Sequence, residues 1–281
     1  HRYITVITRR LINLYRILEE MNAVQVRKNV NRQTVAILIF GACENHGDHM
    51  PFGSDFLVPT ELAKRVAKRS DKSKNVLILP AVPYGVSLHH MDFQMTISLE
   101  PETLVRVIED IFTSLVKNDI KKILIINGHD GNIAPIELAA RAVKDRYPEV
   151  TIACLEAWWV LAGEITKNLF DVWNGLGHGG EAETSAMLAV RPDLVDMKYA
   201  PQEIFPKLPK NIRIYWKFNE LTNTGVTGAP RKATIRKGQK ALKAIEDVLL
   251  SFVDDMEKHD WKYGLHHLYK GDNEGHSKNK Q

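Results

Sequence analysis

Short runs of apolar residues alternate with longer amphipathic segments along most of this chain. Such runs have the length and composition of strands that are buried on both faces of a sheet. We expect these strands at residues 34–40, 75–80, 122–126 and 150–155. Because strands that alternate with helices form parallel sheets with helices on both faces, the pattern predicts an α/β fold.

The amphipathic segments carry apolar side chains at helical spacing. They predict helices at residues 3–22, 59–70, 101–117, 134–146, 180–190 and 237–257. Pro59 stands at the start of the second of these, where proline fits the first helical turn. Residues 84–98 form a long loop, and residues 199–234 are the least regular part of the chain, which we expect to pack on a neighbour or to cover a cleft. Since no Pro/Gly/Ser-rich linker divides the chain, we expect one domain over residues 1–281.

Composition narrows the class of protein. The chain has 281 residues, a net charge of +4 and 34 acidic residues interspersed among the basic ones, so a nucleic-acid partner is not implied. Its two cysteines, Cys43 and Cys154, suit a reducing compartment, and we expect a cytoplasmic protein without a disulfide scaffold. No apolar run reaches the ~18 residues that a membrane span needs, so no membrane partner is expected.

Candidate chemistry is concentrated in the loops that follow the predicted strands and precede a later helix. In open α/β sheets these loops form the ligand site. Six of the eleven histidines lie in four such loops, together with several carboxylates; the histidines are His46, His49, His89, His90, His129 and His178.

The first of these loops offers both imidazole and carboxylate ligands. Glu44 and His46 are two residues apart, which places both side chains on one face of an extended segment. Asp55 follows a Gly-Ser turn before a helix, and its carboxylate could bridge two cations. His129 in a glycine-bounded turn and Glu181 at a helix start add two further ligands. Three carboxylates and two imidazoles could hold two divalent ions, for which Zn²⁺, Mn²⁺ and Fe²⁺ are all suitable.

Each of these residues also has an ordinary structural interpretation. A single carboxylate such as Asp55 often caps a helix, and a single histidine often belongs to a turn. Trp158, after the last predicted strand, is either a core residue or a pocket wall. The hypothesis of a metal site therefore depends on the combination and not on any one residue.

Taken together, the loops resemble the creatininase family of metal-dependent amidohydrolases. Residues 44–55 are similar to the family's E-x-H-G-x-H-x-P-x-x-x-D signature. Residues 84–98, 127–132 and 178–185 are similar to its second, third and fourth loops, in the same order along the chain. The resemblance covers about residues 35–200.

The resemblance implies a three-layer α/β/α fold with a mostly parallel central sheet, two divalent ions per subunit and a homo-oligomer, often a hexamer. It implies that the metal ligands are Glu44, His46, Asp55 (bridging), His129 and Glu181. It also implies that His178 contacts substrate and serves the departing nitrogen. Glu183 and Asp130 are candidates to orient imidazoles, and we expect the substrate near His90, Asp130, Trp158 and Asn174.

Departures from the family pattern narrow the substrate. Creatininase proper has a tyrosine and a ligating glutamate after its N-G-H, where this chain has Asp130 and Gly131. It also has a tryptophan four residues before the histidine of H-G-G, where this chain has Asn174. Other members open formamide groups of a pyrimidine nucleotide precursor or hydrolyse an oxidised inositol, so creatinine is one candidate among several.

Three functions follow from this resemblance. The first is a dinuclear hydrolase of a small amide, in which water held between the two ions supplies hydroxide at neutral pH and His178 passes a proton to the leaving nitrogen. The second uses the same metal centre to open an oxidised inositol or a lactone, with no nitrogen leaving group. The third is a non-catalytic member that binds metal for structure. Five ligands would leave coordination positions open on two ions, whereas structural metal sites are usually closed, so this function is disfavoured.

Overall fold

The computed structural model describes residues 16–70, 75–202, 212 and 214–262. Its strands form one sheet in the order β1-β3-β2-β4-β5, and every strand pair is parallel. The strands are β1 (Arg16–Ile17), β2 (Val35–Phe40), β3 (Val76–Ile78), β4 (Lys122–Asn127) and β5 (Thr151–Leu155). The predicted parallel α/β sheet is therefore confirmed.

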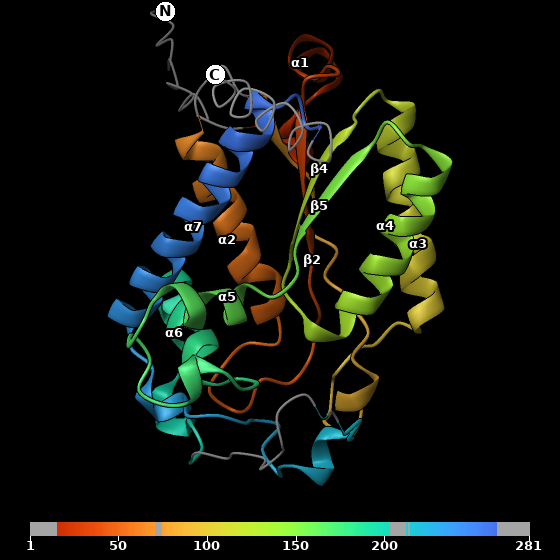
Figure 1. The fold of residues 1–281 in the computed structure, drawn as a ribbon. Helices are drawn as coiled ribbons and strands as arrows, with labels where there is room; N and C mark the ends of the chain where they lie inside the picture. Colours follow the sequence, from red (N-terminus) through yellow and green to blue (C-terminus); the bar gives the residue numbers. More distant parts are fainter. Residues whose placement is uncertain (1–15, 71–74, 203–211, 213, 263–281) are drawn as a thin grey trace, which may run out of the picture.

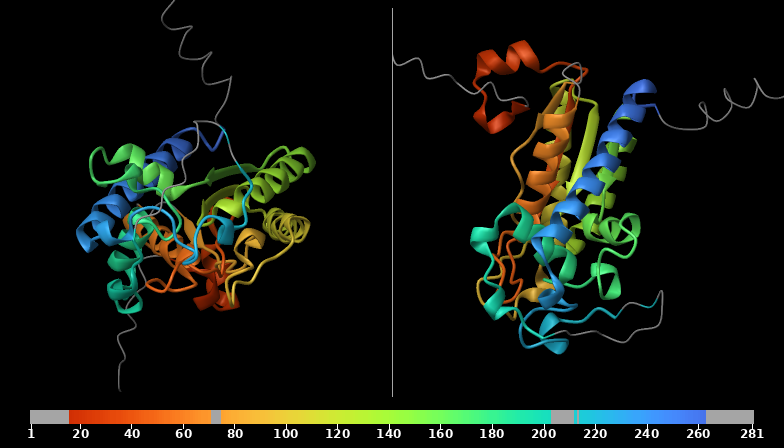
Figure 2. Two further views of the ribbon diagram at one scale, coloured as in Figure 1. Left: turned by 90° about the horizontal axis from the view of Figure 1, so that it is seen from below. Right: turned by 90° about the vertical axis from the view of Figure 1, so that its left-hand side faces the viewer.

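Helices cover both faces of the sheet and make three layers (Figures 1 and 2). One face carries α2 (Ser54–Arg69), α5 (Trp158–Ile165), α6 (Glu181–Val190) and α7 (Ile235–Lys258). The other carries α3 (Pro101–Lys117) and α4 (Ile133–Arg146). A short helix, α1 (Ala23–Asn29), lies at the end of the sheet opposite the long loops (Figure 1).

Strand β2 shows why the sheet is buried on both sides. Its side chains alternate between two hydrophobic clusters, because successive residues of a strand point to opposite faces. Val35, Ile37 and Ile39 pack in the cluster with α2 and α7. Ala36, Leu38 and Phe40 pack in the cluster with α3 and α4. An apolar run without polar interruption is the sequence pattern that this double burial produces.

The N-terminal helix prediction is wrong in its described part. Of the predicted helix 3–22, residues 1–15 lie outside the described residues, and Arg16–Ile17 form the edge strand β1, paired with β3. The next α-helix begins only at Ala23. Apolar residues at helical spacing do not exclude a strand, and pairing with β3 buries Ile17 at the sheet edge.

Two further helices differ from the prediction. Helix α2 begins at Ser54, five residues before the predicted start, so Pro59 lies inside it and Asp55 lies in its first turn. Pro59 has no amide hydrogen for the Asp55 carbonyl, and Gly128 packs against that carbonyl so closely that a Cβ there would lie 1.7 Å away. Helix α5 (Trp158–Ile165) was not predicted from the sequence. Its first turn contains both Trp158 and Trp159.

The carboxyl ends of the strands all point toward one end of the molecule, where the long loops gather (Figure 1). The described part of residues 212–227 crosses this end as an arch, drawn in cyan at the bottom of Figure 1. None of the described helices is both long and apolar enough to cross a membrane.

Candidate metal centre

Four of the predicted ligands meet at the carboxyl ends of β2 and β4. Glu44 and His46 come from the loop after β2, Asp55 from the first turn of α2, and His129 directly follows Gly128 at the end of β4. All four side chains are buried. The alternation of strands and loops brings together residues that are far apart in sequence, as the position of ligand sites in open α/β sheets predicts.

The two oxygens of Asp55 face different histidines. Oδ1 lies 2.9 Å from His46 Nε2, and Oδ2 lies 3.2 Å from His129 Nδ1. Glu44 Oε1 also lies 3.2 Å from His129 Nδ1. Asp55 thus stands between His46 on one side and the His129–Glu44 pair on the other.

Backbone carbonyls orient three imidazoles toward these carboxylates. A carbonyl only accepts, so the ring nitrogen that contacts it donates. His46 Nδ1 donates to Glu44 O at 3.1 Å, His129 Nε2 to Val86 O at 2.8 Å, and His178 Nε2 to Asn45 O at 2.7 Å. The second nitrogen of each ring then faces the carboxylates, as in metal sites where a carbonyl fixes the ring of a ligating histidine.

Burial and charge act in opposite directions on the ionisable groups here. Burial by itself lowers the pKa of His46, but the nearby Asp55 carboxylate outweighs it and raises that pKa to about 10. Burial favours protonation of Glu44, but His129 and His90 hold its pKa well below the usual value. Burial, aided by His46, lowers the pKa of His178 to about 4, so its imidazole is neutral at pH 7.

Glu183, and not Glu181, completes the group. The ligand atoms of His46, Asp55 and Glu183 all lie within 4.8 Å of one another. Burial raises the pKa of Glu183 to about 7, and its Oε2 accepts from the Gly179 amide at 2.7 Å.

The structure does not bring Glu181, predicted to be a ligand, to this centre. Its carboxylate accepts from Lys237 Nζ of α7 and from the amides of Asp171 and Val172. Residues two apart on a helix point in different directions, and here one glutamate faces α7 while the other faces the cavity. The sequence H-G-G-E-A-E offers both glutamates and does not show which face of α6 meets the site.

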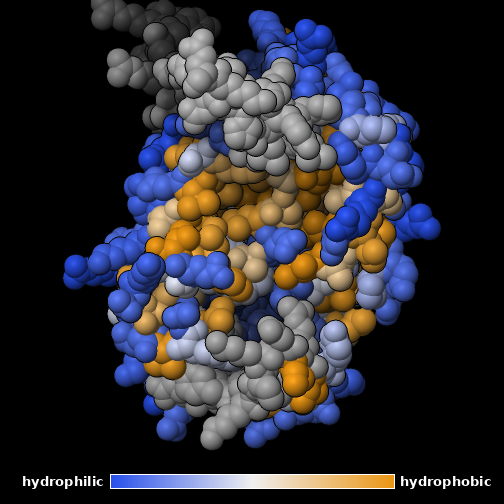
Figure 3. Space-filling model, in the orientation of Figure 1, coloured by the Kyte–Doolittle hydropathy of each residue, from blue (hydrophilic) through white to orange (hydrophobic). Residues whose placement is uncertain are grey.

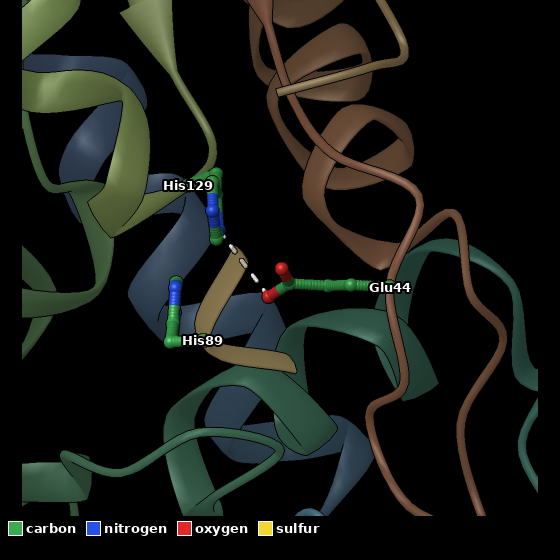
Figure 4. Close-up of side chains that lie close together, drawn as sticks. All are labelled: Glu44, His89 and His129. Carbon is green, nitrogen blue, oxygen red and sulfur yellow. Dashed lines mark ion pairs between the residues drawn. The ribbon is translucent and has the colours of Figure 1, made fainter. Parts of the chain in front are cut away.

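His89 is a candidate ligand that we did not select from the sequence. Its ring stacks on His129 with centroids 5.7 Å apart, and Glu44, His89 and His129 form a further group of possible ligands (Figure 4). In Figure 4, Glu44 reaches in from the loop after β2 toward His129. The neighbouring His90, predicted to be near substrate, is buried 3.7 Å from Glu44 and lines the cavity. The only feature of the sequence that could have identified His89 as a ligand is the pair of adjacent histidines in the loop after β3.

A cavity of about 600 Å³ lies over the carboxylates and histidines. The residues that line it include four that we expected near substrate or catalysis: His90, Asp130, His178 and Glu183. Trp158 does not line it and is buried in the hydrophobic core; of these two adjacent tryptophans, Trp159 lines the cavity. Asn174 is also absent from the lining, because its carbonyl and Cβ pack against Gly163 of α5. The structure therefore does not bring Trp158 and Asn174, which we expected near substrate, to the cavity wall.

Much of the cavity wall is apolar and comes from the arch. The lining residues that share this origin are Ile212, Ile214, Tyr215, Trp216, Phe218, Leu221 and Thr227. Phe218 lies against the imidazoles, with its centroid 3.9 Å from that of His90 and 5.0 Å from that of His178. The expectation that residues 199–234 cover a cleft is confirmed for this described part, although no motif identified the individual residues.

His49 connects the first loop to the start of α6. It is buried, and its Nε2 lies 3.0 Å from the hydroxyl of Thr184, which in turn donates to Gly179 O at 3.0 Å. Because that hydroxyl has one hydrogen, His49 Nε2 is the donor to it. The chain from His49 through Thr184 holds the backbone between His178 and Glu183.

The donor set fits divalent metal ions. Both oxygens of Glu44, Nε2 of His46 and Oδ2 of Asp55 are buried without a hydrogen-bond partner. Buried polar atoms in proteins are nearly always satisfied, so several orphans pointing to one place indicate a ligand. Mixed carboxylate and imidazole donors suit Zn²⁺, Mn²⁺ or Fe²⁺.

Comparisons with characterised proteins agree with this site. The chain is 32% identical to creatinine amidohydrolase of Pseudomonas putida over 201 residues, which cover 62% of this chain and 75% of that protein. It is 27% identical to the mycofactocin precursor peptide peptidase of Mycobacterium ulcerans, over 77% of this chain and 83% of the relative. It is 22% identical to 3-dehydro-scyllo-inosose hydrolase of Thermotoga maritima, over 85% and 82% of the two chains.

Solved structures give the same family. A crystal structure of a putative creatinine amidohydrolase from Bacteroides fragilis aligns with a TM-score of 0.77 and 26% identity, over 90% of this chain and all of that one. Creatininase solved with Mn aligns with a TM-score of 0.72 and 26% identity, over 86% and 98% of the two chains, and a Zn-Zn form aligns similarly. The Creatininase family model, described as creatinine amidohydrolase, matches residues 19–253. This chain therefore belongs to the creatininase family of hydrolases.

Proposed function

We propose that this protein is a dinuclear metal-dependent hydrolase that cleaves a C–N amide bond of a small substrate. The observation that carries the proposal is the position of Asp55, whose two oxygens face His46 and His129 separately. One ion would be held by Glu44, Asp55 and His129, and the other by His46, Asp55 and Glu183. The relatives solved with Mn and in a Zn-Zn form support these two metals.

The chain supplies the remaining chemistry around these ligands. Divalent ions, when bound, lower the pKa of water and polarise a carbonyl. His178 Nδ1 faces the centre, 3.6 Å from Glu44, while Nε2 is tied to Asn45 O. A neutral imidazole in this position can take a proton from the attacking water and return it to the departing nitrogen.

Ring opening of an oxidised inositol is the second candidate. The relative from Thermotoga maritima is named as an inosose hydrolase and matches 85% of this chain. The same ligands and the same histidine would act on a carbonyl carbon, and the product would contain no new amine, ammonia or formate. The homo-oligomer that the resemblance implies stays a prediction.

The test is turnover of a defined pool. Protein loaded with Mn²⁺ or Zn²⁺ is incubated with creatinine, a formamidopyrimidine ribonucleotide, an oxidised inositol and a short peptide, and each is followed by mass spectrometry. We expect consumption of one of the amides. Consumption of the inositol alone would favour the second candidate, and consumption of none by metal-loaded protein would contradict both.

The His178→Ala variant separates catalysis from metal binding in the same assay. We expect it to retain its metal and to lose about 10²–10⁴ in rate, because the proton transfer is lost while the ligands remain. Full activity of this variant would remove His178 from the mechanism.

A further inference from the structure

We propose that the described part of the arch, residues 212 and 214–227, is a binding subsite for an aromatic or branched aliphatic group carried by the substrate next to its scissile amide. The proposal rests on the hydrolase function above and adds the substrate class. It predicts that the preferred substrate is an amide with an apolar group of about the size of a benzyl side chain, and not a small polar ring alone.

The two halves of the cavity have different chemistry. One half consists of carboxylates and imidazoles at the ends of the strands. The other half consists of apolar side chains, of which Ile212, Ile214, Tyr215, Trp216, Phe218 and Leu221 come from the arch. Trp159 and Leu176 extend this apolar wall from the α5 side. A ligand that fills both halves must be polar at one end and apolar at the other.

The cavity is larger than the polar group of an amide requires. Its volume of about 600 Å³ lies within the range of roughly 300–1,000 Å³ that holds drug-sized ligands. Figure 3 shows a hollow at the lower end of the molecule with hydrophobic side chains beside it. Ile212 and Ile214, which line the cavity, are 56% and 49% exposed. Apolar side chains that gather at a cavity mouth mark a binding surface.

The arch is fixed to the catalytic histidine. The Thr227 amide donates to His178 O, and the His178 amide donates to Thr227 Oγ1, both at 2.9 Å. Gly177, with φ +126°, permits this approach, since a Cβ there would lie 2.4 Å from Thr227 O. Phe218 contacts His90 and His178 on the inner side of the arch. A group bound against Phe218 therefore lies next to the reacting bond.

The first experiment compares two hydroxamic acids that differ only in a phenyl ring. Propionohydroxamic acid and 3-phenylpropionohydroxamic acid share a metal-chelating head, and their binding to the Zn²⁺-loaded protein is measured by calorimetry. Burial of the ring predicts binding about 30-fold tighter for the phenyl compound. In Phe218→Ala and Trp216→Ala we expect this ratio to fall below about 5.

The matched control is Tyr199→Ala, which removes an exposed aromatic side chain outside the cavity lining and should keep the full ratio. Equal affinity of the two hydroxamates in the unaltered protein would overturn the subsite. It would leave the metal centre standing, because both compounds would still bind through their heads.

A second measurement does not depend on the metal. Saturation-transfer NMR of 3-phenylpropionamide and propionamide is recorded with chelator-treated protein. We expect ring protons to receive saturation in the unaltered protein and to lose it in Phe218→Ala. Ring contact here, together with no hydroxamate binding, would support the subsite and contradict the proposed metal centre. Absence of ring contact would overturn the subsite.

Discussion

The two glutamates at the start of α6 are two residues apart and have opposite surroundings. Glu183 lines the cavity beside His46 and Asp55, and burial raises the pKa of its carboxyl to about 7. Glu181 faces Lys237 and two backbone amides, which satisfy its carboxylate fully. The role of a glutamate in a ligand-rich motif therefore depends on the helix face that it occupies and on the partner that it contacts there.

The two halves of the cavity also differ in the chemistry of their side chains. On the polar half, the carboxylates and imidazoles include buried atoms without a hydrogen-bond partner, and these atoms could bind a metal ion. On the apolar half, the arch presents hydrocarbon to the same space.

The largest expected effect is that of Asp55→Ala. Asp55 contacts both His46 and His129, so its loss removes one ligand from each proposed ion. We expect metal affinity to fall by more than about a hundredfold and activity to fall with it, since even residues that only support ligands cost about 10–100-fold. Metal content by mass spectrometry and hydrolysis of the preferred substrate are the two measurements.

Asp48→Ala is the matched control, because Asp48 is an exposed carboxylate in the same loop. It should retain both metal and activity. Full activity of a metal-free Asp55→Ala protein would show that the cluster has another purpose.

The second comparison exchanges each glutamate of α6 for glutamine. Glu183→Gln should lose metal affinity by about 10–100-fold, because a neutral amide is a poor ligand, and should leave folding nearly unchanged. Glu181→Gln should retain metal and lose about 2 kcal/mol of unfolding free energy, because Lys237 loses one of its two carboxylate partners and keeps only Asp171.

Urea unfolding gives the stability of each variant, and metal titration gives the metal affinity of each. The reverse pattern, with metal loss in Glu181→Gln and a normal affinity in Glu183→Gln, would restore Glu181 as the ligand. Equal metal loss in both would indicate that α6 moves as a whole.

Much of the sheet and of the polar half could be predicted from the sequence. Helix 101–117 was predicted with its observed bounds, because its apolar positions and its N-terminal proline agree. Glu44, His46, Asp55 and His129 were identified because ligand-type residues follow buried strands and because the motifs are specific. The position of a residue directly after a strand, or in the first turn of a helix, can be predicted from the local sequence.

The remainder depended on contacts distant in sequence. Choosing between Glu181 and Glu183 requires the position of Lys237, which is more than fifty residues further along the chain. Choosing between Trp158 and Trp159 requires helix α5, whose short and largely apolar sequence has no clear amphipathic pattern. The sequence of the arch has no helical or strand-like pattern of apolar residues. Its apolar side chains could therefore be assigned to the cavity only once the path of the backbone across the site was known.

The smallest expected effect concerns the backbone that carries both His178 and Glu183. Thr184→Val keeps the shape of the side chain and removes the hydroxyl that links His49 Nε2 to Gly179 O. We expect kcat to fall by about tenfold or less with KM and metal content little changed, since a positioning contact of about 1 kcal/mol is lost and no ligand is removed. Steady-state kinetics at saturating metal measures this split.

Thr184→Ser supplies the control, because serine retains the hydroxyl in the same place on α6. If the hydrogen-bond chain acts by orienting His178 and Glu183, the serine variant should recover most of the lost kcat, whereas both variants would be equally impaired if the threonine methyl group were responsible. Since His49 donates to this hydroxyl, His49→Phe combined with Thr184→Val should lower kcat no further than the more impaired single variant. Additive losses would mean that the two residues act separately and that the connection between the first loop and α6 lies elsewhere, in the His178–Asn45 contact.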